Sequence, residues 1–203
     1  MIAIIDYGVG NLFSLKCSFK AIGEEAVVTN DPKIINNADR IILPGVGAFG
    51  DAAKKLKESG MADVLLKECE KGKPIMGICL GMQLLFDESY EFGIHKGLGL
   101  ISGKIVPFEG RIDEDYRIPQ IGWNSLNLYN NSPIFSDLKD GDFVYFVHSY
   151  FAECDKKNVI ATSDYGIEFT AAVQKDNIFG CQFHPEKSGE IGMKILKAFS
   201  EVK

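Results

Sequence analysis

The stretch 73-KPIMGICLGMQLL-85 decides the fold. A short apolar run of strand length ends in Gly77-Ile78-Cys79-Leu80-Gly81, and the residues that follow have the composition of a helix. Glycines on both sides of a residue at a sharp strand-to-helix turn permit the close backbone packing of a nucleophile elbow. We therefore expect Cys79 at the end of a strand and at the N-terminus of a helix.

Cys79 has two interpretations at this point. As a nucleophile, its thiolate would be stabilised by the helix N-terminus, and the amide of Leu80 would face an oxyanion formed by attack on a carbonyl. As a structural residue, it would be a small buried thiol in a tight connection, because free cysteines are often inert. The pentapeptide alone does not separate the two.

The composition indicates an ordinary globular protein. The 203 residues suffice for a single domain over 1–203, with 46% hydrophobic and 25% charged residues. A net charge of −6 with scattered Lys and Arg disfavours a nucleic-acid partner. Residues 1–6 lack a basic signal-peptide region and no apolar run has membrane-spanning length, so we expect a cytoplasmic protein without a membrane partner.

The cysteines are odd in number and lack the close pairs of a zinc or redox site. They are Cys17, Cys69, Cys79, Cys154 and Cys181. The loop at 6–11 contains Gly-x-Gly, but the third glycine and the acidic residue of a dinucleotide site are missing. We expect reduced thiols, no metal and no cofactor.

Strand patterns at 2–5, 25–29 and 40–43, and in the run ending at Ile78, alternate with helical patterns, which predicts an α/β fold with a mostly parallel central sheet and helices on both faces. Chemistry in such sheets collects at the carboxyl ends of the strands. The loop 44-PGVGAFG-50 lies at one such end. This loop could be only a tight turn. If it lies beside Cys79, it could instead orient the amide of Val46 or Gly47 as the second donor of an oxyanion hole.

The second half has a different pattern. Between about 98 and 172, short strands at 103–108, 143–151, 159–163 and 168–174 predict an antiparallel extension of the same sheet. An apolar strand at 177–183 then precedes His184-Pro185-Glu186 and a closing helix. His184 should therefore lie past a strand end, as Cys79 does.

A thiol becomes an effective nucleophile when a base takes its proton and a third group holds that base. Cys79, His184 and Glu186 can fill these parts. The other histidines are His95, in an expected surface loop, and His148, within an aromatic strand. The alternative for His184 is a structural histidine, and for Glu186 an exposed acid capping the last helix.

Six segments together carry a family resemblance: 6-DYGVGN-11, 44-PGVGAF-49, 77-GICLGMQ-83, 122-GWN-124, 146-FVHSY-150 and 183-FHPEKS-188. The chain resembles the class I, triad-type glutamine amidotransferases, which have a flavodoxin-like fold. More narrowly, it resembles the glutaminase subunits of imidazole glycerol phosphate synthase, an enzyme of histidine biosynthesis. One departure is Gln120, where the family often has histidine.

The resemblance implies that Cys79 attacks the side-chain amide of glutamine, with His184 as general base and then acid, and Glu186 orienting it. The amides of Leu80 and of the Val46-Gly47 turn would hold the oxyanion. The remaining implied roles are glutamine binding for Gln83, His148, Ser149 and Tyr150, and contact with a cyclase for Asn11, Trp123, Tyr145 and Lys187.

The resemblance also implies a partner. Ammonia released into water at neutral pH is protonated and loses its lone pair, so it must reach its acceptor without meeting solvent. We expect that acceptor site on another polypeptide, which the resemblance gives as the (β/α)8-barrel cyclase of a heterodimer.

Three other interpretations stay open. The chain could serve a different synthase with the same glutamine chemistry. It could be a non-catalytic flavodoxin-like protein that uses Cys79 as an oxidation sensor or chaperone element, although such a protein has no need of His-Pro-Glu at the last strand end. It could also be a simple cysteine hydrolase that releases its product to water.

Overall fold

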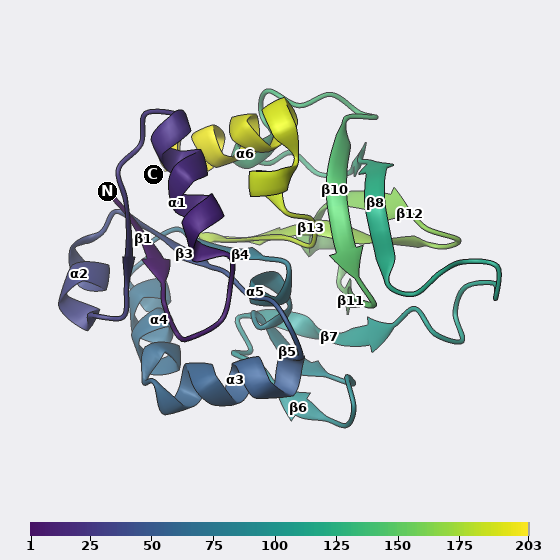
Figure 1. The fold of residues 1–203 in the computed structure, drawn as a ribbon, viewed down its shortest axis with the longest axis horizontal. Coiled ribbons are helices and arrows are strands. Elements are labelled where there is room, and N and C mark those ends of the chain that lie inside the picture. The colour runs from purple at the N-terminus through teal and green to yellow at the C-terminus, as the bar shows by residue number, and fades with distance from the viewer. Residues whose placement is uncertain (203) are drawn as a thin grey trace.

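The computed structural model describes residues 1–202 as one large sheet with helices on both faces and a small two-stranded sheet beside it (Figure 1). The helices are α1 (Leu12–Ala21), α2 (Pro32–Asn37), α3 (Phe49–Glu58), α4 (Met61–Glu70), α5 (Leu80–Gln83) and α6 (Gly189–Glu201). The strands are β1 (Ile2–Ile5), β2 (Ala26–Thr29), β3 (Arg40–Leu43), β4 (Ile75–Ile78), β5 (Phe86–Ser89), β6 (His95–Lys96), β7 (Ile101–Pro107), β8 (Gln120–Ser125), β9 (Asn127–Leu128), β10 (Phe143–His148), β11 (Tyr150–Cys154), β12 (Val159–Asp164), β13 (Glu168–Lys175) and β14 (Ile178–Cys181).

The large sheet has the strand order β2-β1-β3-β4-β14-β13-β11-β7-β5-β6, with β12 beside β13 and β9 beside β12. Pairing is parallel from β2 through β14 and antiparallel from β14 through β7. The predicted fold class, a mostly parallel sheet with an antiparallel extension, is confirmed.

Alternation along the buried strands divides the core between two faces. Ile2 and Ile4 of β1 belong to a cluster that includes Phe19 of α1 and Phe199 of α6, whereas Ile5 belongs to the cluster under α2, α3 and α4. A strand that is buried on both sides needs a continuous apolar run, which is what β1 has. Among residues 1–202, no helix is both long and apolar enough to cross a membrane.

The helix after Cys79 is shorter than predicted. It covers only Leu80–Gln83, and strand β5 begins at Phe86. Leu84, Leu85 and Phe86 are all at most 1% exposed, and a continuous apolar run does not distinguish a buried helix from a buried strand. Cys79 is the N-cap of this helix, as predicted. Because a four-residue helix has little macrodipole, any stabilisation of its thiolate would come mainly from the free amides of the first turn.

The strand predicted over 143–151 is two strands. Strand β10 pairs with β8 as the separate two-stranded sheet, and after Ser149 strand β11 joins the large sheet beside β7. His95, predicted in a surface loop, lies in β6 and covers Gly50 of α3, where an added Cβ would come within 2.7 Å of the imidazole ring.

Candidate active site

Cys79 sits at a strained turn between β4 and α5. Its φ of +53° is a conformation that side-chain-bearing residues rarely adopt. The glycines around it are required by packing, because a Cβ on Gly77 would come within 2.6 Å of the Gly81 backbone and a Cβ on Gly81 would lie 1.9 Å from the Leu43 oxygen. The Cys79 amide donates to the Cys181 oxygen at 2.7 Å, which ties the turn to the end of β14.

His184 and Glu186 form a buried pair just past β14. The His184 Nδ1 lies 2.8 Å from Glu186 Oε1, and the two side chains are 3% and 1% exposed. The alternative of an exposed, helix-capping Glu186 is therefore wrong. Burial alone would lower the pKa of His184, but hydrogen bonds and charge attraction from Cys79 and Glu186 raise that pKa to about 9. The imidazole is thus held by Glu186 through Nδ1 and lines the same cavity as Cys79.

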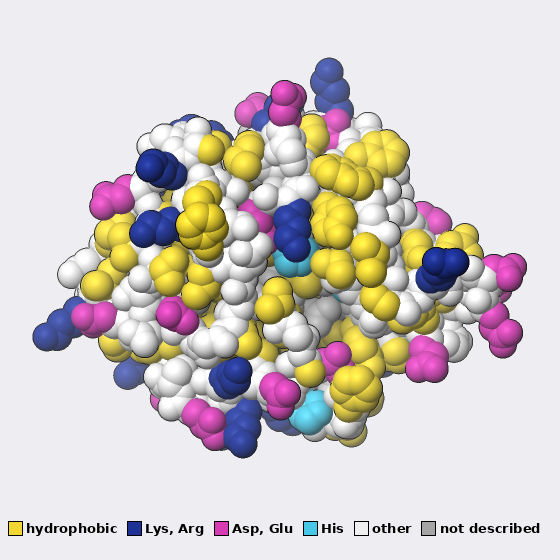
Figure 2. All heavy atoms as spheres, in the orientation of Figure 1, with side chains coloured by type: hydrophobic (Ala, Val, Ile, Leu, Met, Phe, Trp, Pro, Cys, Tyr) yellow, Lys and Arg dark blue, Asp and Glu magenta, His cyan; other side chains and the backbone are white. Residues whose placement is uncertain are grey.

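A cavity of about 320 Å³ collects the side chains and amides that the sequence singled out. Its walls include Val46, Gly47, Cys79, Leu80, Gln83, His148, Ser149, Tyr150, His184 and Lys187. They come from the segments after β3, β4 and β14 of the large sheet, from α5, and from the connection between β10 and β11. In Figure 2 a histidine side chain is visible near the middle of this face, below a basic side chain.

Gln83 is buried and its amide is already engaged. Its Nε2 donates to the Tyr150 oxygen at 3.1 Å and to Gln182 Oε1 at 3.0 Å. His148 is also held, because its Nδ1 lies 2.8 Å from the same Tyr150 oxygen and its ring packs among Phe108, Phe146 and Phe169. Burial lowers the pKa of His148 to about 4, so its ring is neutral at physiological pH.

Of the four residues expected at a cyclase interface, Trp123, Tyr145 and Lys187 lie close together. Trp123 and Tyr145 are cross-strand neighbours on β8 and β10 with ring centroids 6.0 Å apart, and the Lys187 ammonium lies 5.8 Å from the Tyr145 ring centroid. Asn11 instead caps α1, accepting from the Ser14 amide. The Tyr145 oxygen accepts from the His184 amide at 3.0 Å, which links this group to the cavity.

Sequence reasoning missed two residues at the site. Gln182 is fully buried and bridges Gln83 to the Cys79 sulfur. Glu91, in the β5–β6 connection, lines the cavity and accepts a hydrogen bond from the Phe49 amide at the start of α3. Gln182 stands two residues before His184, so its place next to a strand end was a usable signal. Nothing in the local pattern marks Glu91.

The chain is similar to known proteins of one family. A family model described as glutamine amidotransferase class-I matches residues 3–202. The imidazole glycerol phosphate synthase subunit HisH of Geobacter metallireducens is 50% identical over 203 residues, covering 98% of this chain and 97% of the relative. The protein of the same name from Bacillus cereus strain ATCC 14579 is 51% identical over 202 residues, covering 100% and 95%.

Solved structures support the fold. PurLQS from Thermotoga maritima has a TM-score of 0.75 at 23% identity, covering 98% of this chain and 96% of that one. The glutaminase domain of Trypanosoma brucei CTPS, solved with bound acivicin, has a TM-score of 0.68 at 15% identity, covering 100% and 94%. The chain belongs to the class-I glutamine amidotransferase family and, within it, to the HisH subunits of imidazole glycerol phosphate synthase.

Proposed function

We propose that this chain is a glutaminase subunit that hydrolyses glutamine to glutamate and ammonia and passes the ammonia to a cyclase subunit in histidine biosynthesis. The observation that carries the proposal is a cavity lined by a thiol on a strained turn and by an imidazole whose Nδ1 is bonded to the buried Glu186 carboxylate. The family membership supports the same chemistry. Residues 1–203 would act as one glutaminase domain.

The reaction we propose has two halves. The Cys79 thiolate attacks the carboxamide carbon of glutamine, and the imidazolium of His184 gives a proton to the departing ammonia, which leaves a thioester. Neutral His184 then takes a proton from water, the resulting nucleophile attacks the thioester, and glutamate leaves as the thiolate reforms. Glu186 holds the ring through Nδ1 and stabilises its charged form.

Each half passes through an oxyanion. The amides of Leu80 and of the Val46-Gly47 turn are the proposed donors, since these residues line the cavity beside Cys79. Gln83 and the backbone of His148-Ser149-Tyr150 would contact the amino-acid end of glutamine. The carboxylate of Glu91, on the same wall, is suited to the substrate ammonium group.

The proposed partner is the barrel-type cyclase, in a heterodimer. Free ammonia must travel to its acceptor without solvent, so a subunit that makes ammonia requires a docked subunit that consumes it. Asn11, Trp123, Tyr145 and Lys187 are the proposed contacts. Hydrolysis without the partner would waste glutamine, so we expect weak activity from the isolated chain.

The test is a steady-state glutaminase assay with and without the cyclase and its nucleotide ligand, with Cys79→Ala as the blank. We expect low activity alone, strong activation in the complex and none in the blank. High turnover without the cyclase would contradict the proposed coupling, and turnover that survives Cys79→Ala would contradict the proposed nucleophile.

A further inference from the structure

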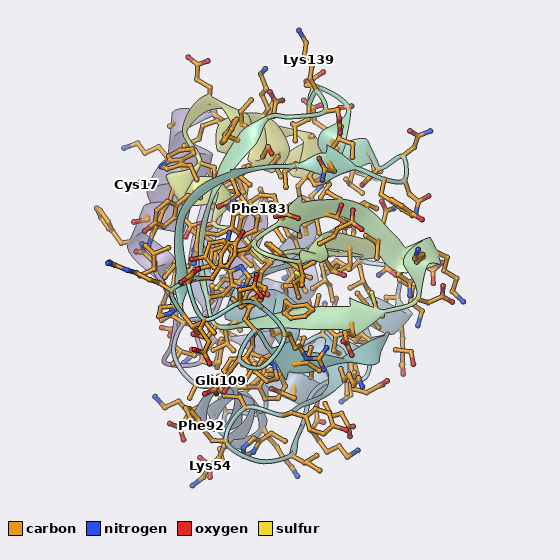
Figure 3. The ribbon with its side chains drawn as sticks, turned by 90° about the vertical axis from the view of Figure 1, so that its right-hand side faces the viewer. Cys17, Lys54, Phe92, Glu109, Lys139 and Phe183 are labelled. Atoms are coloured by element: carbon orange, nitrogen blue, oxygen red, sulfur yellow. The ribbon has the colours of Figure 1, made fainter. Side chains whose placement is uncertain are left out.

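The side chain of Gln182 makes a hydrogen-bonded link to the nucleophile. It is 0% exposed and follows β14 directly. Its Nε2 lies 3.8 Å from the Cys79 sulfur, and its Oε1 lies 3.0 Å from Gln83 Nε2. The next residue, Phe183, is also 0% exposed and lies inside the molecule (Figure 3). A buried amide loses its hydrogen bonds to water, so its partners inside the protein matter.

The orientation of both amides follows from one backbone oxygen. The Tyr150 carbonyl can only accept, so the group of Gln83 that faces it must be the NH₂. The second hydrogen of that NH₂ is then directed at Gln182, which must present its oxygen. The NH₂ of Gln182 is left to point at the Cys79 sulfur. Gln83 therefore donates to both Tyr150 and Gln182, and Gln182 donates to the Cys79 sulfur, with no ambiguous assignment.

We propose that Gln182 is a positioning residue that donates a hydrogen bond to the Cys79 thiolate and fixes the Gln83 amide against the substrate-binding strand. The inference rests on the proposed role of Cys79 as nucleophile. It assigns Gln182 to the reaction as well as to the core.

The Gln182 donor matters because another neighbour of the sulfur, the Val147 oxygen, is an acceptor. The Val147 oxygen lies 3.9 Å from the sulfur and suits a protonated thiol, which can donate to it. A thiolate accepts only, so that carbonyl would disfavour it. The Gln182 amide and the His184 ring offset this effect, since hydrogen bonds to an ionised acceptor are about twice as strong as neutral ones.

The position also couples the substrate wall to the nucleophile. Gln83 lines the cavity, and Tyr150 begins β11 on another wall. A change in the position of the Gln83 amide would therefore alter the hydrogen bond that Gln182 donates to the sulfur.

Two substitutions separate the role of Gln182 toward Gln83 from its role toward the sulfur. Gln182→Met removes both polar groups at similar volume, whereas Gln182→Glu keeps an oxygen for Gln83 but removes the donor to sulfur.

The primary readout is the pH profile of Cys79 alkylation by iodoacetamide, followed on the peptide that contains Cys79 because four other cysteines are present. We expect Gln182→Met to raise the midpoint of this profile by about one pH unit, and Gln182→Glu to raise it further because a carboxylate repels the thiolate. In the complex, kcat of Gln182→Met should fall about ten- to a hundredfold, with KM changed less than about threefold.

Gln174→Met is the matched control. It makes the same chemical change on β13, where Gln174 pairs with Phe179 at the opposite end of β14. The control should leave the alkylation midpoint and kcat unchanged. Thermal unfolding checks that each variant is folded.

A folded Gln182→Met with an unchanged midpoint and kcat would overturn the inference, as would an equal change in the control. If the wild-type complex shows no Cys79-dependent ammonia release, the proposed function fails. The alkylation profiles would still decide whether Gln182 supports the thiolate.

Discussion

The backbone of Cys79 has a positive φ, a conformation that is unfavourable for a residue with a side chain. A positive φ in a residue with a Cβ costs roughly 1–2 kcal/mol, and such strain persists only where the surroundings over-determine it. Here the bond from the Cys79 amide to the Cys181 oxygen and the tight contacts of Gly77 and Gly81 supply that constraint. The sulfur is consequently fixed before any substrate arrives.

Replacing Glu186 by glutamine should separate the charge of the triad from its geometry. The amide is the same size but carries no charge, so the pKa of His184 should fall toward its ordinary value. We expect kcat to drop by about a hundredfold or more, because the ring loses its orienting, charge-stabilising partner. An NMR titration of the His184 ring measures the shift. Glu190→Gln, an exposed acid at the start of α6, is the control.

The same pKa has a consequence for stability. His184 titrates near pH 9 in the folded chain and near 6.5 ordinarily, so its protonated form favours folding. This contribution is complete below pH 6.5 and is lost as the pH rises through 9. We expect the midpoint of thermal unfolding to fall by several degrees across that range. Cys79→Ala, which removes one cause of the raised pKa, should show a smaller fall; an equal fall in both would contradict this account.

Residue identity predicted part of the site. With only three histidines in the chain, the choice of His184 followed from its place after an apolar strand. Gln182 and Glu91 were missed because their importance lies in contacts with Gln83 and Phe49, which are 99 and 42 positions away along the chain. The place of Gln182 beside a strand end was a usable signal, but a spacing pattern along the chain does not identify the distant side chain that such a residue contacts.

At the scale of elements, α5 passes so close to β3 that no side chain fits between them. A Cβ on Gly81 would lie 1.9 Å from the Leu43 oxygen. We expect Gly81→Ala to cost roughly 3 kcal/mol or more, which lowers the unfolding midpoint by about 6–12 °C. Gly72→Ala is the comparison, since its φ is +82° but nothing lies within 4 Å, so strain alone should cost about 1 kcal/mol. Equal losses would show that packing at Gly81 is unimportant.

The order of strands and helices in the first half was predictable because buried parallel strands are short apolar runs with loops at both ends. The boundary between α5 and β5 was not, since the segment from Leu80 to Phe86 is buried throughout and lacks a period. The break at Ser149 was hidden in the same way, because β10 and β11 are both aromatic-rich and follow each other directly.

At the scale of the whole molecule, apolar side chains are exposed on the β8–β10 sheet, and β10 ends at His148 in the wall of the cavity. Ile121, Trp123 and Phe143 on β8 and β10 are 62%, 51% and 56% exposed, and Figure 2 shows hydrophobic side chains gathered over these strands. Exposed apolar groups beside a functional cavity are typical of a docking surface. They are consistent with the proposed cyclase interface.

Trp123→Ala tests this surface. Buried tryptophans often dominate protein interfaces, so we expect affinity for the cyclase to fall at least about tenfold. The pH profile of Cys79 alkylation in the isolated chain should stay unchanged. Calorimetry or a titration of activation measures the affinity. Tyr129→Ala, an equally exposed aromatic at 53% that lies outside the β8–β10 pair, is the control. Equal loss in both variants would place the interface elsewhere.

Strand β14 lies in the middle of the sheet, between β4 and β13, although it is the last strand in the chain. During synthesis the ribosome therefore releases the segment with the thiol long before the segment with its base. Until that late strand inserts, β4 keeps an open edge and the cysteine stays inert. Prematurely terminated chains of this protein should thus be unable to consume glutamine.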